Sequence, residues 1–135
     1  MKGVTLTQPE PANLMDLAAG EFGLISRRGT DYRGLLAIHA GLNRSLICSD
    51  HGAYKFGSVI GTVELVDSFH YRAVPVIYQH LPWAHSFKGF CWLVTNPQRL
   101  DNPIGLDGSP GLWDWPAGDA IILQHQFNKA LRANV

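Results

Sequence analysis

The chain has 135 residues and a mass of 14.9 kDa, which is the size of one domain with one hydrophobic core. Hydrophobic residues make up 46% of it and charged residues 16%, a balance that excludes intrinsic disorder. Eleven basic and eleven acidic residues cancel, so any nucleic-acid binding would need a local cationic patch rather than a basic chain.

Cysteine content and hydropathy narrow the cellular context. Two cysteines, Cys48 and Cys91, are too few for a disulfide framework and favour a reducing, intracellular compartment. The first residues, MKGVTLTQPEP, lack the apolar segment of a signal peptide, and no apolar run approaches the ~20 residues that span a bilayer. We therefore expect a soluble cytoplasmic domain that has no membrane partner.

The first third of the chain is predicted to form a strand, a helix and a second strand. Alternation over residues 4–8 predicts a short strand, which the following prolines end. Apolar residues at helical spacing over 12–20 predict a helix of about two turns, with Pro11 in its first turn and Gly20 as its C-cap. Residues 32–40, YRGLLAIHA, have the apolar composition of a buried strand.

A long strand rich in Val and Ile is predicted over residues 57–71. Simple alternation places Val59 and Val63 on one face of this strand and Ile60 on the other. Gly61 inside the strand predicts a bulge or a bend, because glycine weakens regular pairing.

The second half adds a strand, two irregular segments and a helix. Residues 89–96 are a predicted strand that Pro97 closes. The preceding excursion, residues 72–88, is long enough to be a functional loop. Residues 102–116 are turn-rich, with two tryptophans that can anchor a loop against the domain, and Asp119 is the expected N-cap of a final helix.

Together these elements predict the fold class. Several strands with two or three peripheral helices indicate a small α+β barrel. The domain is expected to cover residues 1–118. Residues 119–135 are expected to form an additional C-terminal helix that packs on the domain or extends from it.

Histidine and cysteine residues prompt a metal-site hypothesis. Cys48-x-x-His51 has acceptable ligand spacing, and His39 or the pair His80 and His85 could complete a set. Closed zinc sites usually show two such pairs and this chain has one, so the alternative is a loop Cys and His, with His39 a hydrogen-bonded strand histidine. We expect neither a metal nor a cofactor.

No complete set of nucleophilic catalytic residues is evident. Ser49, Asp50 and His51 are adjacent in sequence and cannot form a triad with one another. The chain contains neither G-x-S-x-G nor G-x-x-x-x-G-K-[ST]. His39 and Glu64 remain candidates for proton transfer, and an inward-facing Glu64 would have a raised pKa, although such carboxylates more often have a structural partner.

Arginines gather before the strand at residues 32–40. Arg27, Arg28 and Arg33 could bind phosphate through their planar guanidinium groups, and the aromatic residues could stack on bases. Three arginines around a turn also occur commonly as a solvated turn, so this signal has low specificity.

Several motifs in a fixed order are similar to those of one known family. LTQP near the start, YRGLLAIHAG, GSVIGTVELVDS, FCWLVTNPQRL and NPIGLDGSPGLWDW follow one another as in ASCH domains, the activating-signal-cointegrator homology domains of the PUA-like superfamily. The resemblance runs from about Val4 to Trp115. It implies a small PUA-like β-barrel with flanking helices and a cleft that binds RNA, nucleotides or modified nucleosides, which some members hydrolyse.

The chain departs from this family where the family's cleft residues are expected. The cleft usually has a Gln-Pro-Trp element and a G-x-K-x-x-E-x-R signature. Here QPEP keeps Gln8 but has Glu10 in place of Trp. GEFGLISR has Phe22 in place of Lys and Ile25 in place of Glu, and a register with Arg28 as the signature Arg does not restore both residues.

The resemblance and its departures together predict a non-catalytic binding domain, because hydrolysis through the missing Lys–Glu pair would be lost. The expected ligand is RNA, a nucleotide or a modified nucleoside. The candidate ligand-binding residues are Gln8, Arg27, Arg28, His39, Trp92, Asn96 and Trp113. One alternative is a protein-interaction module, possible for a phage- or mobile-element-encoded protein, where compact ASCH proteins are common. The other is a hydrolase of modified nucleosides or RNA with relocated catalytic residues.

Overall fold

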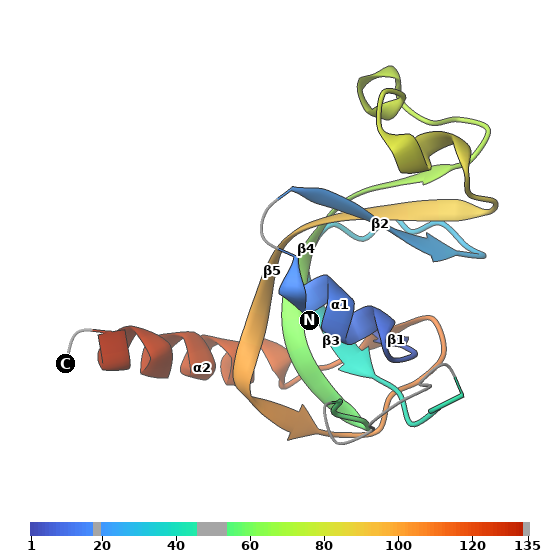
Figure 1. Cartoon of the computed structure of the whole chain (residues 1–135). Coiled ribbons are helices and arrows are strands. Elements are labelled where there is room, and N and C mark those ends of the chain that lie inside the picture. The colour runs from blue at the N-terminus through green and yellow to red at the C-terminus, as the bar shows by residue number, and fades with distance from the viewer. Residues whose placement is uncertain (18–19, 46–53, 134–135) are drawn as a thin grey trace.

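The computed structural model describes residues 1–17, 20–45 and 54–133 (Figure 1). The elements are, in chain order, β1 (Lys2–Leu6), α1 (Glu10–Asp16), β2 (Glu21–Ser26), β3 (Gly34–Ala40), β4 (Ser58–His70), the 3-10 helices η2 (Val76–Tyr78) and η3 (Pro82–His85), β5 (Phe90–Gly105), β6 (Leu112–Asp114) and α2 (Gly118–Ala133).

The described strands form one mixed sheet of six strands in the order β2-β5-β4-β3-β1-β6. β1 runs parallel to β3, and every other neighbouring pair is antiparallel. The predicted α+β class is therefore confirmed. The sheet is not closed, because β2 and β6 are edge strands, so the barrel stays a prediction. The long strands β4 and β5 curve through the whole molecule (Figure 1).

The N-terminal third differs from its prediction in two places. α1 begins at Glu10 with Pro11 in its first turn, but it ends at Asp16, and the extended Leu17 is its C-cap. The predicted cap at Gly20 is therefore wrong. Sequence patterns predict no strand over residues 21–26, yet this segment is β2, which pairs along its length with β5.

A bulge in β4 corrects the predicted faces of that strand. Ile38 pairs with Gly61 and His39 pairs with Val59, which leaves Ile60 as the extra residue beside the glycine. The bulge expected at Gly61 is thus present. It turns Ile60 into the main core with Val63, whereas Val59 lies in a second core, so the grouping of Val59 with Val63 is wrong.

A second bulge carries β5 past its predicted end. The strand continues to Gly105, although it contains Pro97. Asn96 has a left-handed φ of 53°, and the register with β4 shifts between Thr95 and Gln98. Asn96 and Pro97 occupy this bulge, where the missing N–H of proline breaks no hydrogen bond of the ladder.

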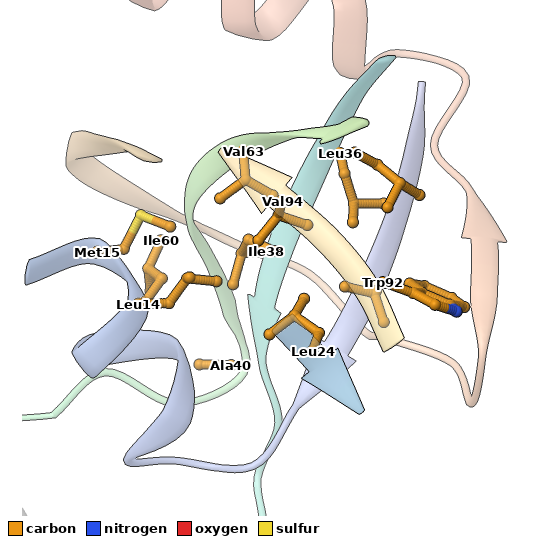
Figure 2. Close-up of a cluster of buried hydrophobic side chains, with 12 residues drawn as sticks. Leu14, Met15, Leu24, Leu36, Ile38, Ala40, Ile60, Val63, Trp92 and Val94 are labelled. Atoms are coloured by element: carbon orange, nitrogen blue, oxygen red, sulfur yellow. The ribbon is translucent and has the colours of Figure 1, made fainter. Parts of the chain in front are cut away.

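The main core lies inside the curve of the sheet. Figure 2 shows side chains of α1, β2, β3, β4 and β5 pointing toward one another. Leu36, Val63 and Val94 are fully buried there. Burying each side chain of this kind stabilises the fold by ~1.5–3 kcal/mol, so this core fixes α1 and β2 against the sheet.

Two further clusters of buried side chains hold the C-terminal half. Trp113 and Trp115 are buried with Ile122 of α2, which confirms that the two tryptophans anchor the turn-rich segment. Phe69, Phe87 and Cys91 form the third cluster, at the base of the excursion over residues 72–88. Figure 1 shows this excursion projecting from one end of the sheet.

The C-terminal helix α2 begins at Gly118 and extends away from the sheet (Figure 1). Asp119 lies inside its first turn, so the prediction of Asp119 as the N-cap is wrong. Only Gly118 and Ile122 of its residues are buried. Among the described residues, none of the helices combines the length and apolar character that crossing a membrane requires.

Candidate ligand-binding clefts

A cleft of about 790 Å³ lies between α1, β1 and β2. We call it the β1–β2 cleft; its lining includes Thr5, Glu10, Asn13, Phe22, Leu24 and Trp83. Three strands separate β1 from β2 in the sheet, so the curl of the sheet brings both strands to one cleft. The volume falls in the range of roughly 300–1,000 Å³ that small-molecule sites usually have.

Two aromatic side chains from distant parts of the chain line this cleft. Phe22 of β2 is half-buried at the edge of the main core. Trp83 of η3 lies over Gly23, where an added Cβ would stand 3.7 Å from its Cε3 atom. Because residue 23 is a glycine, the indole approaches the β2 backbone closely. Two aromatic side chains in one cleft suit a flat ligand.

The cleft also collects the positions at which the chain departs from the ASCH motifs. Glu10 and Phe22 both line it, whereas Ile25 is 56% exposed and does not. Leu24 of the same strand lines the cleft as well. β2 therefore contributes apolar side chains to the cleft.

Glu10 is the one charged residue among the described residues that line the β1–β2 cleft. Partial burial raises the pKa of its carboxyl, although the residue as a whole remains exposed. The carboxylate can accept hydrogen bonds from ligand N–H groups, and the side-chain amide of Asn13 can both donate and accept.

A second cleft, of about 860 Å³, lies on the other side of Thr5. We call it the His39 cleft; its lining includes Thr5, His39, Phe56, Leu106 and Gly108. Gly108 packs so closely on the imidazole that an added Cβ would stand 2.6 Å from Nδ1 of His39. The guanidinium of Arg44 covers the Phe56 ring at 3.8 Å from its centroid.

A chain of hydrogen bonds fixes His39 in this cleft. Its Nε2 lies 2.6 Å from the carbonyl oxygen of Leu106, which can only accept, so Nε2 carries the proton. Nδ1 then accepts from Thr5 Oγ1 at 3.3 Å, and Trp113 Nε1 donates to the same hydroxyl at 3.1 Å. The interpretation of His39 as a hydrogen-bonded strand histidine is confirmed, because both ring nitrogens have a partner in the fold.

Two of the predicted ligand-binding residues make structural hydrogen bonds. Gln8 is 1% exposed; its Oε1 accepts from the Ala12 N–H, and its Nε2 donates to the carbonyl of Lys55 at 2.8 Å. Trp92 is buried in the main core, and its Nε1 donates to the carbonyl of Arg28 at 2.8 Å. Both residues therefore stabilise the fold, and neither of them lines the β1–β2 cleft.

The other predicted residues lie apart from one another. Arg27 and Arg28 are exposed beyond the end of β2, and Asn96 is exposed in the bulge of β5. Arg33 forms an ion pair with Asp67 at 3.5 Å, so it belongs to a structural turn. Among the seven predicted ligand-binding residues, the structure brings His39 and Trp113 together, with ring centroids 5.9 Å apart, and it joins Trp92 to the Arg28 backbone, but the seven do not converge on one site.

The candidates for acid–base and metal chemistry are dispersed as well. Glu64, whose orientation the strand pattern left open, is exposed rather than inward-facing. His85 donates from Nε2 to the carbonyl of Gln79. In the ranges 1–17, 20–45 and 54–133, no three His, Cys, Asp or Glu side chains gather as a metal site would require. Cys48 and His51 lie outside those ranges.

Sequence reasoning missed two residues that these clefts depend on. Thr5 stands between the clefts and joins His39 to Trp113, but a threonine in an alternating strand carries no distinctive signal. Trp83 lines the β1–β2 cleft, and its signal was a tryptophan directly after a proline in the long excursion.

No known protein-family model and no curated protein matches this chain.

Proposed function

We propose that the β1–β2 cleft binds a nucleobase, presented by RNA, a nucleotide or a modified nucleoside, and that the protein binds it without hydrolysis. One observation carries this proposal. Glu10 and Phe22, which replace the family's Trp and Lys, line a single cleft together with Trp83. A flat base can stack on these aromatic faces, and a carboxylate can accept hydrogen bonds from its amino edge.

We also propose that the fold is an opened variant of the PUA-like barrel that the sequence motifs imply. The curl that brings β1 and β2 to one cleft supports this relation. The absence of catalysis is part of the proposal, because the only charged side chain lining the described cleft is Glu10, which has no lysine or arginine beside it there.

The direct test is a titration of the protein with the four common ribonucleosides, followed by NMR and tryptophan fluorescence. Phe22→Ala and Trp83→Phe should weaken binding, and the fluorescence change should disappear in Trp83→Phe. Val66→Ala, at an exposed position of β4 outside the cleft, is the control. Titrations without any shift around the cleft would refute the binding function, and turnover of a nucleoside or RNA would refute the non-catalytic part.

A second candidate function rests on α2. Leu123, Phe127 and Leu131 are 66%, 58% and 52% exposed and recur every four residues, so they form one apolar stripe along the helix. The stripe is symmetric about Phe127. In an antiparallel pair of two identical helices, each Leu123 would face Leu131 of the other copy, and the two Phe127 rings would meet. We propose a second copy of this chain as the partner for this stripe.

A further inference from the structure

A small pocket of about 260 Å³ lies under the excursion between β4 and β5. Its lining includes Tyr71, Arg72, Gln79, His85 and Lys88. The volume is below the range of roughly 300–1,000 Å³ of sites for whole small molecules, so the pocket suits a single chemical group.

Two cations converge on one aromatic ring at this pocket. The guanidinium of Arg72 lies 5.4 Å from the ring centroid of Tyr71, and the ammonium of Lys88 lies 4.6 Å from the same centroid. Arg72 Nε also donates to the Tyr71 hydroxyl at 2.9 Å. Tyr71 thus serves as a platform that holds both cations in place.

Neither cation has a carboxylate partner in the described part of the chain. The ion pairs found there involve other residues, and none of the residues that line this pocket is acidic. Arg72 and Lys88 therefore keep most of their hydrogen-bond donors available for an anion.

Backbone and side-chain hydrogen bonds build the pocket around these cations. The Tyr71 N–H donates to the carbonyl of Gly89 at 2.9 Å, which closes the excursion and brings its two ends together. Gln79 Nε2 donates to the carbonyl of Val74, and His85 Nε2 donates to the carbonyl of Gln79 at 2.7 Å. The wall opposite the cations is therefore ordered by hydrogen bonds.

The pocket lies next to two features already described. Trp83 of η3 lines the β1–β2 cleft, while Ala84 and His85 of the same short helix line this pocket, so η3 separates the two. On the other side, the Arg27 backbone packs on Gly89: an added Cβ there would stand 3.9 Å from the Arg27 Cα.

We propose that this pocket binds a phosphate group, held by Arg72 and Lys88 over Tyr71. Two unpaired cations and an ordered polar wall match the requirements of phosphate binding. The further statement that this phosphate belongs to the same nucleotide or RNA strand whose base occupies the β1–β2 cleft rests on the function proposed above. A terminal phosphate monoester and a backbone phosphodiester share this chemistry.

Inorganic phosphate is the first probe, titrated into the isotope-labelled full chain and followed by NMR. We expect saturable shifts at residues 71–72, 79 and 85–88. Each lost cation should weaken binding by about tenfold, which corresponds to about 1.4 kcal/mol, because each removes charge-assisted hydrogen bonds to the anion. The double variant Arg72→Gln with Lys88→Gln should therefore lose saturable binding.

The matched control is Lys129→Gln with Arg132→Gln, which removes the same two charge types from α2 and should leave phosphate binding unchanged. The wild-type shift map decides the question even if the double variant folds poorly. Shifts that spread evenly over surface lysines and arginines, or equal losses in the two double variants, would overturn the proposal.

Three ligands then separate the sources of the phosphate and the two proposals. Adenosine 5′-monophosphate that binds more tightly than adenosine identifies a monoester, and a gain seen only with the dinucleotide ApA identifies a phosphodiester. Either gain should vanish in the Arg72/Lys88 double variant, while adenosine affinity stays unchanged. Phosphate binding without any nucleoside binding would refute the base-binding function alone. Nucleoside binding with no gain from a phosphate would refute the statement that base and phosphate belong to one ligand, and the absence of saturable binding of inorganic phosphate would refute the phosphate inference itself.

Discussion

Met15 of α1 packs directly on Gly61 of β4: its Sδ atom occupies the space that a Cβ on residue 61 would need. The same added Cβ would also stand 2.5 Å from the carbonyl oxygen of Gln98 and 3.3 Å from the Arg99 Cα atom. The glycine is thus required where the helix, β4 and β5 meet.

Gly61→Ala should therefore destabilise the protein by ~1–3 kcal/mol, because two of the clashing atoms belong to backbone that cannot move aside. Urea denaturation followed by circular dichroism measures this loss. Gly105→Ala is the control, since nothing lies within 4 Å of a Cβ at that position. Equal stability of the two variants would contradict the close packing of α1 on the bulge.

The hydrogen-bond chain through Thr5 gives a second prediction. Thr5→Val keeps the shape of the side chain but removes the acceptor for Trp113 Nε1 and the donor for His39 Nδ1. We expect a loss of ~1–3 kcal/mol, the usual cost of leaving a buried polar group without its partner. Thr95→Val on β5 is the matched control, and a similar cost there would show that the hydroxyl of Thr5 is not special.

The Cys91 thiol should be inert in the folded protein near neutral pH. Burial first, and the charge of Asp67 second, raise its pKa from 9.0 to about 11, and only the thiolate reacts quickly. Iodoacetamide at about pH 8 should modify Cys91 only after unfolding, as peptide mass mapping can show separately from Cys48. Fast labelling of native Cys91 would contradict its burial.

The same raised pKa predicts a pH dependence of stability. The unfolded chain releases the Cys91 proton at lower pH than the folded protein does, so the contribution is fully present below about pH 9 and is lost as pH rises through about 11. Unfolding free energies measured across this window should fall less steeply in Cys91→Ala than in the wild type. Parallel curves would show that the thiol pKa is not raised.

Glu10→Gln tests the electrostatics of the β1–β2 cleft. Burial raises the pKa of this carboxyl, so its favourable contribution is present below the ordinary value of 4.5 and is lost as pH rises through the folded-state pKa. The variant should therefore be more stable than the wild type at pH 7, and the difference should shrink in acid. Glu64→Gln, on an exposed position of β4, removes a carboxylate outside the cleft and is the control variant.

The stripe on α2 predicts concentration-dependent self-association. Phe127→Asp would place two like charges opposite each other in the antiparallel pair and should make the protein monomeric in light scattering. Val76→Asp, at a residue that is 82% exposed on η2, is the control for an added charge outside the stripe. A wild-type protein that stays monomeric at millimolar concentration would exclude a second copy as the partner.

Part of this architecture followed from local patterns. Apolar composition identified β3 and β4 because their side chains lie in the cores, and the proline-flanked, tryptophan-rich segments marked the excursion and the anchor at Trp113. Gly61 predicted a bulge because a glycine inside a strand often marks a bulge or a bend.

The structure was needed for features that depend on pairing between distant residues. β2 forms because it pairs with β5. β5 continues past Pro97 because the bulge at Asn96 places the proline, which has no N–H, where the ladder needs no donor. Neither relation has a signal in the local sequence.

By itself, the sequence determined the α+β class and singled out Glu10 and Phe22, since both follow from residues and their spacing. Only the tertiary structure decided that these two positions meet Trp83 in one cleft. It likewise decided that Gln8 and Trp92 are structural, and that Arg72 and Lys88 share one ring. These are long-range contacts, set by the bulges and the curl of the sheet, and no local spacing encodes them.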